Sequence, residues 1–418
     1  MIQTIKDAWK VPELRKRILY TIMMLAVFRL GSHIYVPYIN TEVLAEYIAS
    51  NSMLGLFNII SGDNLKSFTI FAMGITPYIN ASIIMNLLTV AIPALERLAK
   101  QGDEGRKKIS RYTRYAALIL AVVQGLGTTL SMSSILTENT VFVKILVTVV
   151  ITAGTAFLLW MGESITEKGI GNGVSLIIFL GIVSSIPSSI TNIIDGIKAG
   201  TFPVYMLLII LVFIAASVVG VVAVNEGTRK IQIVYAKRVV GRKIYGGQNT
   251  HLPLKVNQAG VIPVIFASVM TMFPSTLASF FPNTKWLASL SKALAWGKFW
   301  TTIIYMALII AFSYFYTMIT FNPVEISNNL RQNGGVIPGI RPGAATTSYI
   351  SKISNRLTIS GALFLMVIAI IPIIAGNLLN ISLQFGGTSL LIMVGVALET
   401  VKALEQQLLI RNYKGFLK

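Results

Sequence analysis

The chain of 418 residues is 54% hydrophobic and only 12% charged, and its mean hydropathy is +0.71. Because soluble domains carry about 25% charged residues, this composition excludes an ordinary soluble protein. The absence of cysteine rules out disulfides, cysteine-ligated zinc and thiol catalysis. Apolar runs long enough to cross a bilayer recur from end to end, which indicates a polytopic membrane protein.

The apolar runs predict ten transmembrane helices. Arg29 and His33 interrupt the first run, and no small-x-small cleavage site follows it, so we expect this helix to be retained rather than removed with a signal peptide. The basic segment 1–17 precedes it, and the tail 404–418 follows the last run. In chain order the predicted helices are approximately 18–36, 68–93, 115–132, 141–161, 174–194, 202–224, 258–278, 299–321, 357–376 and 385–403.

Residues 53–66, between the first two predicted helices, form a short apolar segment of a different kind. Its apolar core runs only from Leu54 to Ile60 and is followed by the polar sequence Ser-Gly-Asp-Asn. Such a core is too short to cross a bilayer. We predict a half-helix that enters the membrane and returns while lining a cavity in the protein, with an ordinary extracytoplasmic surface helix as the alternative.

The distribution of the basic residues predicts the orientation. The chain carries 35 Lys and Arg against 16 Asp and Glu, a formal net charge of +19. If the N-terminus is cytoplasmic, then so are the C-terminus and every second loop, beginning with the loop between helices two and three. The opposite side then receives only six lysines, in agreement with the positive-inside rule; they are Lys66, Lys144, Lys198, Lys285, Lys292 and Lys298.

Ten helices with both ends on one side divide into two sets of five, over 18–194 and 202–403. An odd set that is repeated must be inverted in the membrane, and inverted repeats place a central pathway at their interface. The letters show no convincing repeat, so the two-fold relation is a hypothesis. The predicted fold class is an all-α membrane protein of two inverted five-helix halves with a short re-entrant helix.

Two of the predicted cytoplasmic loops are too long to be simple connections. Residues 225–257 contain two β-leaning stretches on either side of a basic, glycine-containing turn, which predicts a hairpin that projects from the membrane. Residues 322–355 contain several Gly and Pro residues and are predicted to form a loop shaped by them.

Ionisable residues at membrane depth, which transport or catalysis usually requires, are few. Arg29 in the first helix is expected to be a structural pin that bonds carbonyls or faces an aqueous cavity. The remaining Asp and Glu of the apolar segments lie near helix ends, and the spacing of His, Asp and Glu matches no metal site. These features disfavour an ion-coupled pump and predict neither an enzymatic activity nor a cofactor.

The glycines at 169, 171 and 173 superficially resemble a phosphate-binding loop. They do not follow a β-strand, and the stretch lacks the Lys-Ser/Thr ending of such loops. We therefore predict a tight turn between two helices.

Several motifs, in consistent order from the first helix to the last, resemble those of the SecY family, whose members form the pore of bacterial protein translocases. Each motif is moderately specific, and together they are highly specific. They are Arg106–Tyr115 (RKKISRYTRY), Gly162–Gly173 (GESITEKGIGNG), Thr250–Asn257 (THLPLKVN), Gly260–Pro263 (GVIP), Phe321–Pro323 (FNP), Val336–Gly343 (VIPGIRPG) and Gly386–Leu391 (GGTSLL).

The resemblance implies an hourglass pore that is closed by a ring of apolar side chains and opens sideways through a lateral gate. Ile75 and Ile79 are four residues apart and share one face of a helix. A collar of branched apolar side chains would exclude water and ions by dewetting while deforming around a passing polypeptide. The positions onto which the family's ring falls are Ile75, Ile79, Ile178, Ile265 and Ile392; lipid-facing or packed isoleucines are the alternative.

The resemblance also implies a plug and a gate. The plug falls on about 53–66, with Phe57, Asn58, Ile59 and Ile60 at its centre. The gate lies between helices two, three, seven and eight, and its polar cluster falls on Asn80, Gln124 and Asn257. Amides between membrane helices prefer partners across the interface, so the alternative is a permanent bond between helices. The position of Asn80 is a serine in some relatives.

Further implications concern partners. The two long loops would dock a motor ATPase (SecA) or a ribosome through its RNA, with Arg242, Lys243 and Arg341 at their tips. Basic side chains favour such anionic partners and speed their encounter. The family also has two small membrane subunits, SecE and SecG, and a preprotein with a signal sequence as its substrate. A bacterial plasma membrane location follows, with both termini cytoplasmic.

Two other functions remain open at this point. A ten-helix secondary transporter would need charges or unwound half-helices at a midplane substrate site. A basic, RNA-anchoring membrane protein would bind ribosomes without any conducting pathway.

Overall fold

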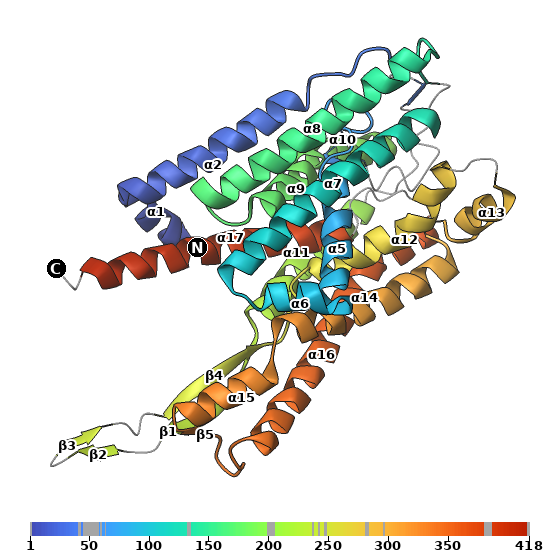
Figure 1. Ribbon diagram of the computed structural model, residues 1–418. Coiled ribbons are helices and arrows are strands. Elements are labelled where there is room, and N and C mark those ends of the chain that lie inside the picture. The colour runs from blue at the N-terminus through green and yellow to red at the C-terminus, as the bar shows by residue number, and fades with distance from the viewer. Residues whose placement is uncertain are drawn as a thin grey trace.

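The computed structural model is predominantly helical, with the helices of the bundle running at a common slant in Figure 1 and a smaller projection extending away from one end. Residues of the projection belong to 228–255 and 323–357. The structure describes residues 2–40, 43–44, 58, 61–62, 64–131, 135–198, 205–235, 238–240, 243–245, 249–280, 284–295, 297–379 and 387–415.

The helices before residue 200 form the first half of the chain. Their bounds are α1 (Ile2–Lys10), α2 (Pro12–Gly31), α5 (Thr76–Ala91), α6 (Pro93–Ala99), α7 (Asp103–Ser131), α8 (Val141–Lys168), α9 (Gly173–Ser184) and α10 (Ile186–Lys198).

The second half contains the remaining helices and all the named strands. The helices are α11 (Tyr205–Glu226), α12 (Ile262–Phe280), α13 (Lys285–Ala293), α14 (Phe299–Thr320), α15 (Pro323–Gln332), α16 (Ala344–Leu379) and α17 (Gly387–Gly415). The strands are β1 (Thr228–Tyr235), β2 (Arg238–Val240), β3 (Lys243–Tyr245), β4 (Asn249–Lys255) and β5 (Gly335–Val336).

Each predicted membrane segment overlaps a helix, and 174–194 overlaps the pair α9 and α10. Within the described part of the chain, six helical stretches are long and apolar enough to cross a membrane, or seven if the bent pair α5 and α6 counts as one span. Helix α2 is too highly charged to count among them, because it contains Arg15, Lys16, Arg17 and Arg29. The total of ten crossings stays a prediction.

The end of α2 corrects the prediction for Arg29. The helix stops at Gly31, so Arg29 lies in the last turn and not at the centre of the span, and its side chain is exposed. A cation in the last turn interacts favourably with the helix dipole, and a long side chain near a helix end can reach the polar interface. Arg29 is therefore a residue of the helix end.

The second predicted span begins later than expected. Residues 68–75 form turns and an isolated bridge between Thr69 and Tyr35, and helix α5 starts at Thr76 with Pro77 in its first turn. Proline is favoured at this position because its missing N–H would have no helical partner. Helix α6 then turns by 104° relative to α5, because Ile92 is extended and Pro93 starts a new helix.

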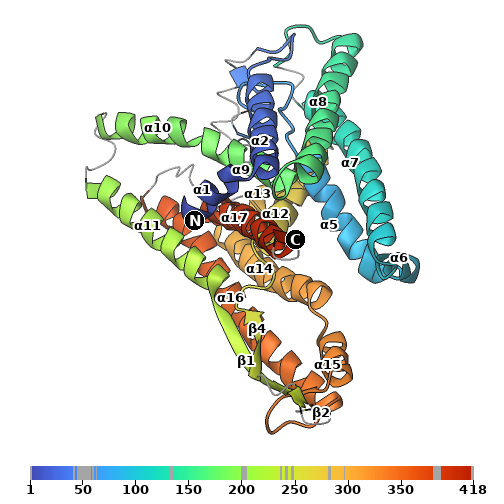
Figure 2. The same ribbon diagram turned by 90° about the vertical axis from the view of Figure 1, so that its left-hand side faces the viewer.

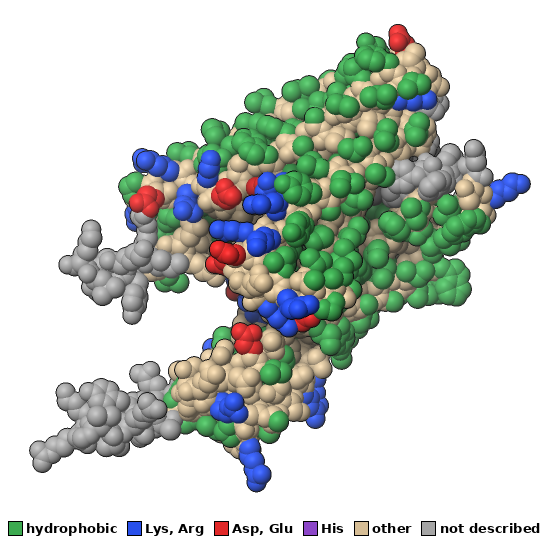
Figure 3. Space-filling model, viewed as in Figure 1, with side chains coloured by type: hydrophobic (Ala, Val, Ile, Leu, Met, Phe, Trp, Pro, Cys, Tyr) green, Lys and Arg blue, Asp and Glu red, His purple; other side chains and the backbone are tan. Residues whose placement is uncertain are grey.

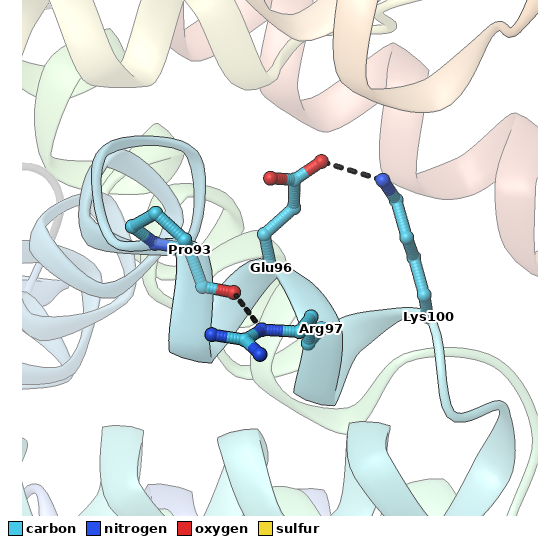
Figure 4. A network of polar contacts seen from close by, with 4 residues as sticks. All are labelled: Pro93, Glu96, Arg97 and Lys100. Atoms are coloured by element: carbon cyan, nitrogen blue, oxygen red, sulfur yellow. Dashed lines mark hydrogen bonds and ion pairs between the residues drawn. The ribbon is translucent and has the colours of Figure 1, made fainter.

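Helix α6 carries a small exposed polar network (Figure 4). Lys100 Nζ donates to Glu96 Oε1 at 2.6 Å, and Arg97 Nε donates to the carbonyl oxygen of Pro93 at 3.3 Å. The hydrogen bond from Lys100, with its positive charge, lowers the pKa of the Glu96 carboxyl below its ordinary value.

The bundle surrounds one large apolar core to which both halves contribute. Phe28 of α2 stacks on Phe71 at a centroid distance of 5.6 Å, and Phe71 stacks on Phe157 of α8 at 6.1 Å. Gly154 of α8 faces the carbonyl oxygen of Ile70 so closely that a Cβ would lie 1.8 Å from it. Residues 64–75 are thus packed as part of the bundle interior.

The projection confirms the predicted hairpin and corrects the second loop. Strands β1 and β4 pair antiparallel from Thr228–Lys255 to Val234–Asn249, and β5 of the second loop joins β1 on its other edge. The second loop, 322–355, is more regular than its Gly and Pro content suggests, because it contains α15, β5 and the start of α16. The two loops share a buried apolar core, to which Ile231, Ile233, Leu254, Leu330, Ile337 and Ile350 contribute.

The predicted tight turn between α8 and α9 is present, and it is held from both sides. Gly171 has φ +74°, a conformation that favours glycine. The backbone N–H of Ile170 donates to Thr21 Oγ1 of α2 at 3.1 Å, and the N–H of Gly173 donates to Thr166 Oγ1 at 2.9 Å. Both backbone N–H groups are thus bonded to side chains of the protein, which is typical of a structural turn.

Candidate functional site

The predicted ring residues come together in the core of the bundle. Ile75 and Ile79 lie at the start of α5, and the N–H of Ile79 donates to the carbonyl oxygen of Ile75 at 3.1 Å. Ile178 of α9 and Ile392 of α17 belong with them to one buried apolar cluster, and half-buried Ile265 of α12 packs against it. Four helices from both halves thus contribute branched apolar side chains to a region without charge.

A small cavity lies beside two of these helical segments, the start of α5 and α9. It is lined by Ile75, Ile178 and the neighbouring residues Phe28, Ser61, Gly74, Leu158 and Ile177. Ser61 belongs to the predicted plug segment. One residue of this segment therefore lies at the same cavity as two predicted ring residues.

Gly62 of the predicted plug segment packs closely against α9. Gly62 has φ +72°, and a Cβ at this position would lie 2.7 Å from Cα of Gly181. Ser184 Oγ donates to the carbonyl oxygen of Gly62 at 3.4 Å. Only a residue without a side chain fits this backbone conformation and this contact.

Polar side chains organise the second part of the predicted plug segment and the turn after it. Asn58 is buried, and its Oδ1 accepts a hydrogen bond from the N–H of Lys66 at 2.7 Å. Thr69 Oγ1 donates to Asn64 Oδ1 at 2.9 Å. Among the predicted plug residues, Phe57, Ile59 and Ile60 lie outside the described part of the chain.

The predicted gate lies where the two halves meet. Helix α12 packs against α5 and α7 of the first half and against α14 of the second. Asn80 lies on α5, Gln124 on α7 and Asn257 just before α12. Among the described residues, no hydrogen bond joins these three amides to one another.

The three amides have different surroundings. Asn257 Nδ2 donates to Asn225 Oδ1 at 2.9 Å and to the carbonyl oxygen of Gly260 at 3.1 Å, so its bonds stay within the second half. Asn80 Oδ1 is buried without a hydrogen-bond partner. An unpartnered amide oxygen is costly in an apolar interior, and Asn80 is therefore the member of this group that a new partner would satisfy.

The predicted docking residues lie on the projection. Arg341 is exposed in the turn before α16, and its carbonyl oxygen accepts a hydrogen bond from Thr346 Oγ1 at 2.9 Å. Lys243 begins β3, which pairs with β2 at the tip of the projection, while Arg242 lies outside the described residues. Pairing of β5 with β1 brings the two predicted loops into one surface.

An ion pair that the sequence analysis missed fixes α7 to α8. Arg114 binds Glu163 through two contacts, Nε to Oε1 at 2.8 Å and a terminal nitrogen to Oε2 at 2.6 Å. Both residues belong to motifs on which the family resemblance rests, and this membership was the one sign in the sequence that could have pointed to the pair. In the described residues, no group of three His, Asp or Glu side chains is arranged to hold a metal ion.

Comparisons with known proteins identify the family of the chain. The sequence model of the family described as SecY matches residues 69–401. The protein translocase subunit SecY of Aquifex aeolicus (strain VF5) is 45% identical over 429 residues, and the alignment covers 100% of both chains.

Two solved structures share the fold. One, described as "The plug domain of the SecY protein stablizes the closed state of the translocation channel and maintains a membrane seal", has a TM-score of 0.66 at 18% identity and 96% coverage of both chains. Another, "Sec61 in the Canine ribosome-channel complex from the endoplasmic reticulum", has a TM-score of 0.61 at 18% identity and the same coverage. The chain therefore belongs to the SecY family of protein translocase subunits, and it is a membrane channel for polypeptides and not an enzyme.

Proposed function

We propose that this chain conducts unfolded preproteins across the bacterial plasma membrane and releases transmembrane segments sideways into the bilayer. The observation that carries the proposal is the convergence of five isoleucines from four helices of both halves. Four of these residues belong to one buried apolar cluster, and half-buried Ile265 packs against it. A solute transporter would instead need a polar or charged pocket at this depth.

The ring acts by excluding water. Branched apolar side chains offer water no hydrogen bonds, so a narrow passage between them empties and blocks ions. The same side chains make only dispersion contacts with one another. A polypeptide of almost any sequence can therefore displace them without breaking specific bonds.

The plug segment completes the seal from one side. The contact of Gly62 with Gly181 and the cavity shared by Ser61 and Ile178 support this role. The described contacts of Gly62 are one weak hydrogen bond and close backbone packing, so the segment can leave when a polypeptide arrives. The SecY structure that resembles this chain has a plug that stabilises its closed state.

The lateral gate opens along the contact of α12 with α5 and α7. Asn80 and Gln124 lie on the first-half side of this contact. A signal sequence that enters the contact offers apolar surface to the helices and backbone groups to unpartnered amides such as Asn80.

The projection serves as the docking surface for the energy-supplying partner. Lys and Arg side chains gather at the end of the bundle next to the projection, whereas apolar side chains cover the flanks of the helices (Figure 3). This asymmetry supports cytoplasmic termini and a cytoplasmic projection. The partners are a motor ATPase (SecA) or a ribosome, together with the small membrane subunits SecE and SecG; the canine relative forms a complex with a ribosome.

A proteoliposome assay tests this function. The chain is reconstituted with SecE and SecG subunits, and a presecretory chain is added with SecA and ATP. Motor-dependent protection of the presecretory chain from protease supports the channel. Uptake of a small solute without such protection would support a secondary transporter, and ribosome binding without any conduction would support an RNA anchor.

A further inference from the structure

The root of the projection is tied to the bundle at one polar contact. Asn225, at the end of α11, accepts a hydrogen bond from Nδ2 of Asn257 at 2.9 Å. The same Nδ2 donates to the carbonyl oxygen of Gly260 at 3.1 Å, just before α12. A single amide group therefore connects the start of the hairpin with the start of the gate helix.

Neighbouring contacts leave this root little freedom to move by itself. The N–H of Val256 donates to the carbonyl oxygen of Gly227 at 2.9 Å, which closes the hairpin immediately beside the amide pair. A Cβ on Gly361 of α16 would lie 2.9 Å from the carbonyl oxygen of Val256. Asn257 itself is buried.

An ion pair joins the end of α11 to α17, the other helix of the second half that carries a predicted ring residue. Lys402 of α17 lies 2.7 Å from Glu226, the residue after Asn225. Helix α17 carries Ile392 and α12 carries Ile265. The end of α11 is thus joined to both helices that provide ring residues in the second half.

The projection is a compact body that can pass on a displacement. It consists of a three-stranded sheet and an apolar core of its own, and the first turns of α16 contribute to that core. The later turns of α16 pack in the core of the bundle. Figure 2 shows β1 running directly on from the end of α11. A load on the projection therefore reaches the bundle through its root and through α16.

We propose that Asn225 is a positioning residue that couples partner docking on the projection to movement of the gate helix α12. Its Oδ1 holds the Asn257 amide, and that amide holds Gly260, which lies just before α12. Docking that tilts the projection moves α12 away from α5 and α7, and the gate opens along that contact. This inference rests on the proposed channel function and names the path by which that channel is opened.

The test compares variants that remove or keep the acceptor oxygen. Asn225→Leu is similar in size but cannot accept a hydrogen bond, Asn225→Asp keeps an oxygen in place, and Thr228→Val alters an exposed neighbour as the control. Each is reconstituted with the small subunits, and translocation of a presecretory chain is measured as a function of SecA concentration. Asn225→Ala removes the same acceptor and replaces Asn225→Leu if that variant does not assemble.

We expect Asn225→Leu to lower the maximal translocation rate by about three- to thirty-fold, the range that corresponds to one hydrogen bond between membrane helices. The SecA concentration for half-maximal rate should not change, because the docking surface remains. Asn225→Asp and Thr228→Val should stay within about twofold of the parent.

Two results would overturn the coupling. One is a maximal rate for Asn225→Leu equal to that of the parent. The other is a loss that appears only as a higher SecA requirement, because the residue would then shape the docking surface alone. Failure of the parent itself to translocate would contradict the proposed function and not this coupling.

Discussion

The bundle and the projection both have an apolar core, but they differ in what surrounds it. In the projection, Ile231 and Ile350 are buried while Arg229, Lys230 and Arg341 are exposed, as in a soluble protein. In the bundle, large apolar side chains such as Leu208 and Val219 of α11 are exposed in great number. Only a bilayer makes such a surface stable, so the projection extends from the membrane into water.

The difference also shows how each region is held together. The projection gains stability from hydrophobic burial and from strand pairing between two loops that are far apart in sequence. Between helices in lipid the hydrophobic driving force is weak, and close packing with small residues takes its place. The contacts of Gly62 with Gly181 and of Gly154 with Ile70 are of this second kind. The two regions should therefore respond differently to mutation.

The largest effect is expected at the ring of the bundle. Ile178→Asn places an amide in the uncharged cluster, so water can enter, and we expect ion conductance of the idle channel to rise about tenfold or more. Planar-bilayer recordings measure this change. Ile178→Val keeps the apolar surface and should conduct like the parent; an unchanged conductance in Ile178→Asn would remove Ile178 from the ring.

A second large effect is expected where the plug segment meets α9. Gly62→Ala forces a Cβ against Gly181 and strains a left-handed backbone, so the segment should leave its seat and the idle channel should leak ions. Gly102→Ala is the matched control, because Gly102 has φ +74° but nothing within 4 Å of the added Cβ. The Gly102→Ala variant therefore has only the backbone strain of a left-handed residue, about 1–2 kcal/mol. Equal leakage from both variants would contradict a sealing role for the Gly62 contact.

A moderate effect is expected in the projection. Ile350→Ala removes a fully buried side chain and should lower the local free energy of unfolding by about 2–5 kcal/mol. Ile359→Ala, on an exposed face of the same helix, should change it by less than about 1 kcal/mol. Hydrogen exchange of the β1 and β4 amides measures both. Similar protection in the two variants would show that the projection has no core of its own.

The smallest effect is expected at the exposed pair on α6. Because Lys100 lowers the pKa of Glu96, the pair stabilises the folded protein above the ordinary carboxyl pKa and loses this contribution as the pH falls through the lowered value. Lys100→Gln should remove that pH dependence while changing stability little at neutral pH. Thermal unfolding in detergent across the acidic range provides the measurement. A Lys100→Gln protein with the parent's full pH dependence would exclude the pair as its source.

The helical architecture could be predicted because length and hydropathy are properties of each segment alone. The predicted bounds of the helices were less accurate where a proline or polar residues, and not hydropathy, determine where a helix begins or ends. Helix α5 starts at Thr76 because Pro77 favours a first turn, and α2 ends at Gly31 before a polar turn. The short apolar core of 53–66 predicted a segment that returns into the bundle. The close contact of Gly62 with Gly181 joins residues more than a hundred positions apart, which no local pattern reveals.

The sequence by itself determined that the chain is a membrane protein, where its helices lie, that a hairpin projects between α11 and α12, and, through family motifs, which isoleucines to consider for the ring. Hydropathy, charge and motif order are all encoded locally, and local signals survive without a structure. Tertiary structure alone decided that the two loops form one body and that Asn257 pairs with Asn225. The partners of a strand edge or an amide depend on which distant segments meet, and chain packing determines that.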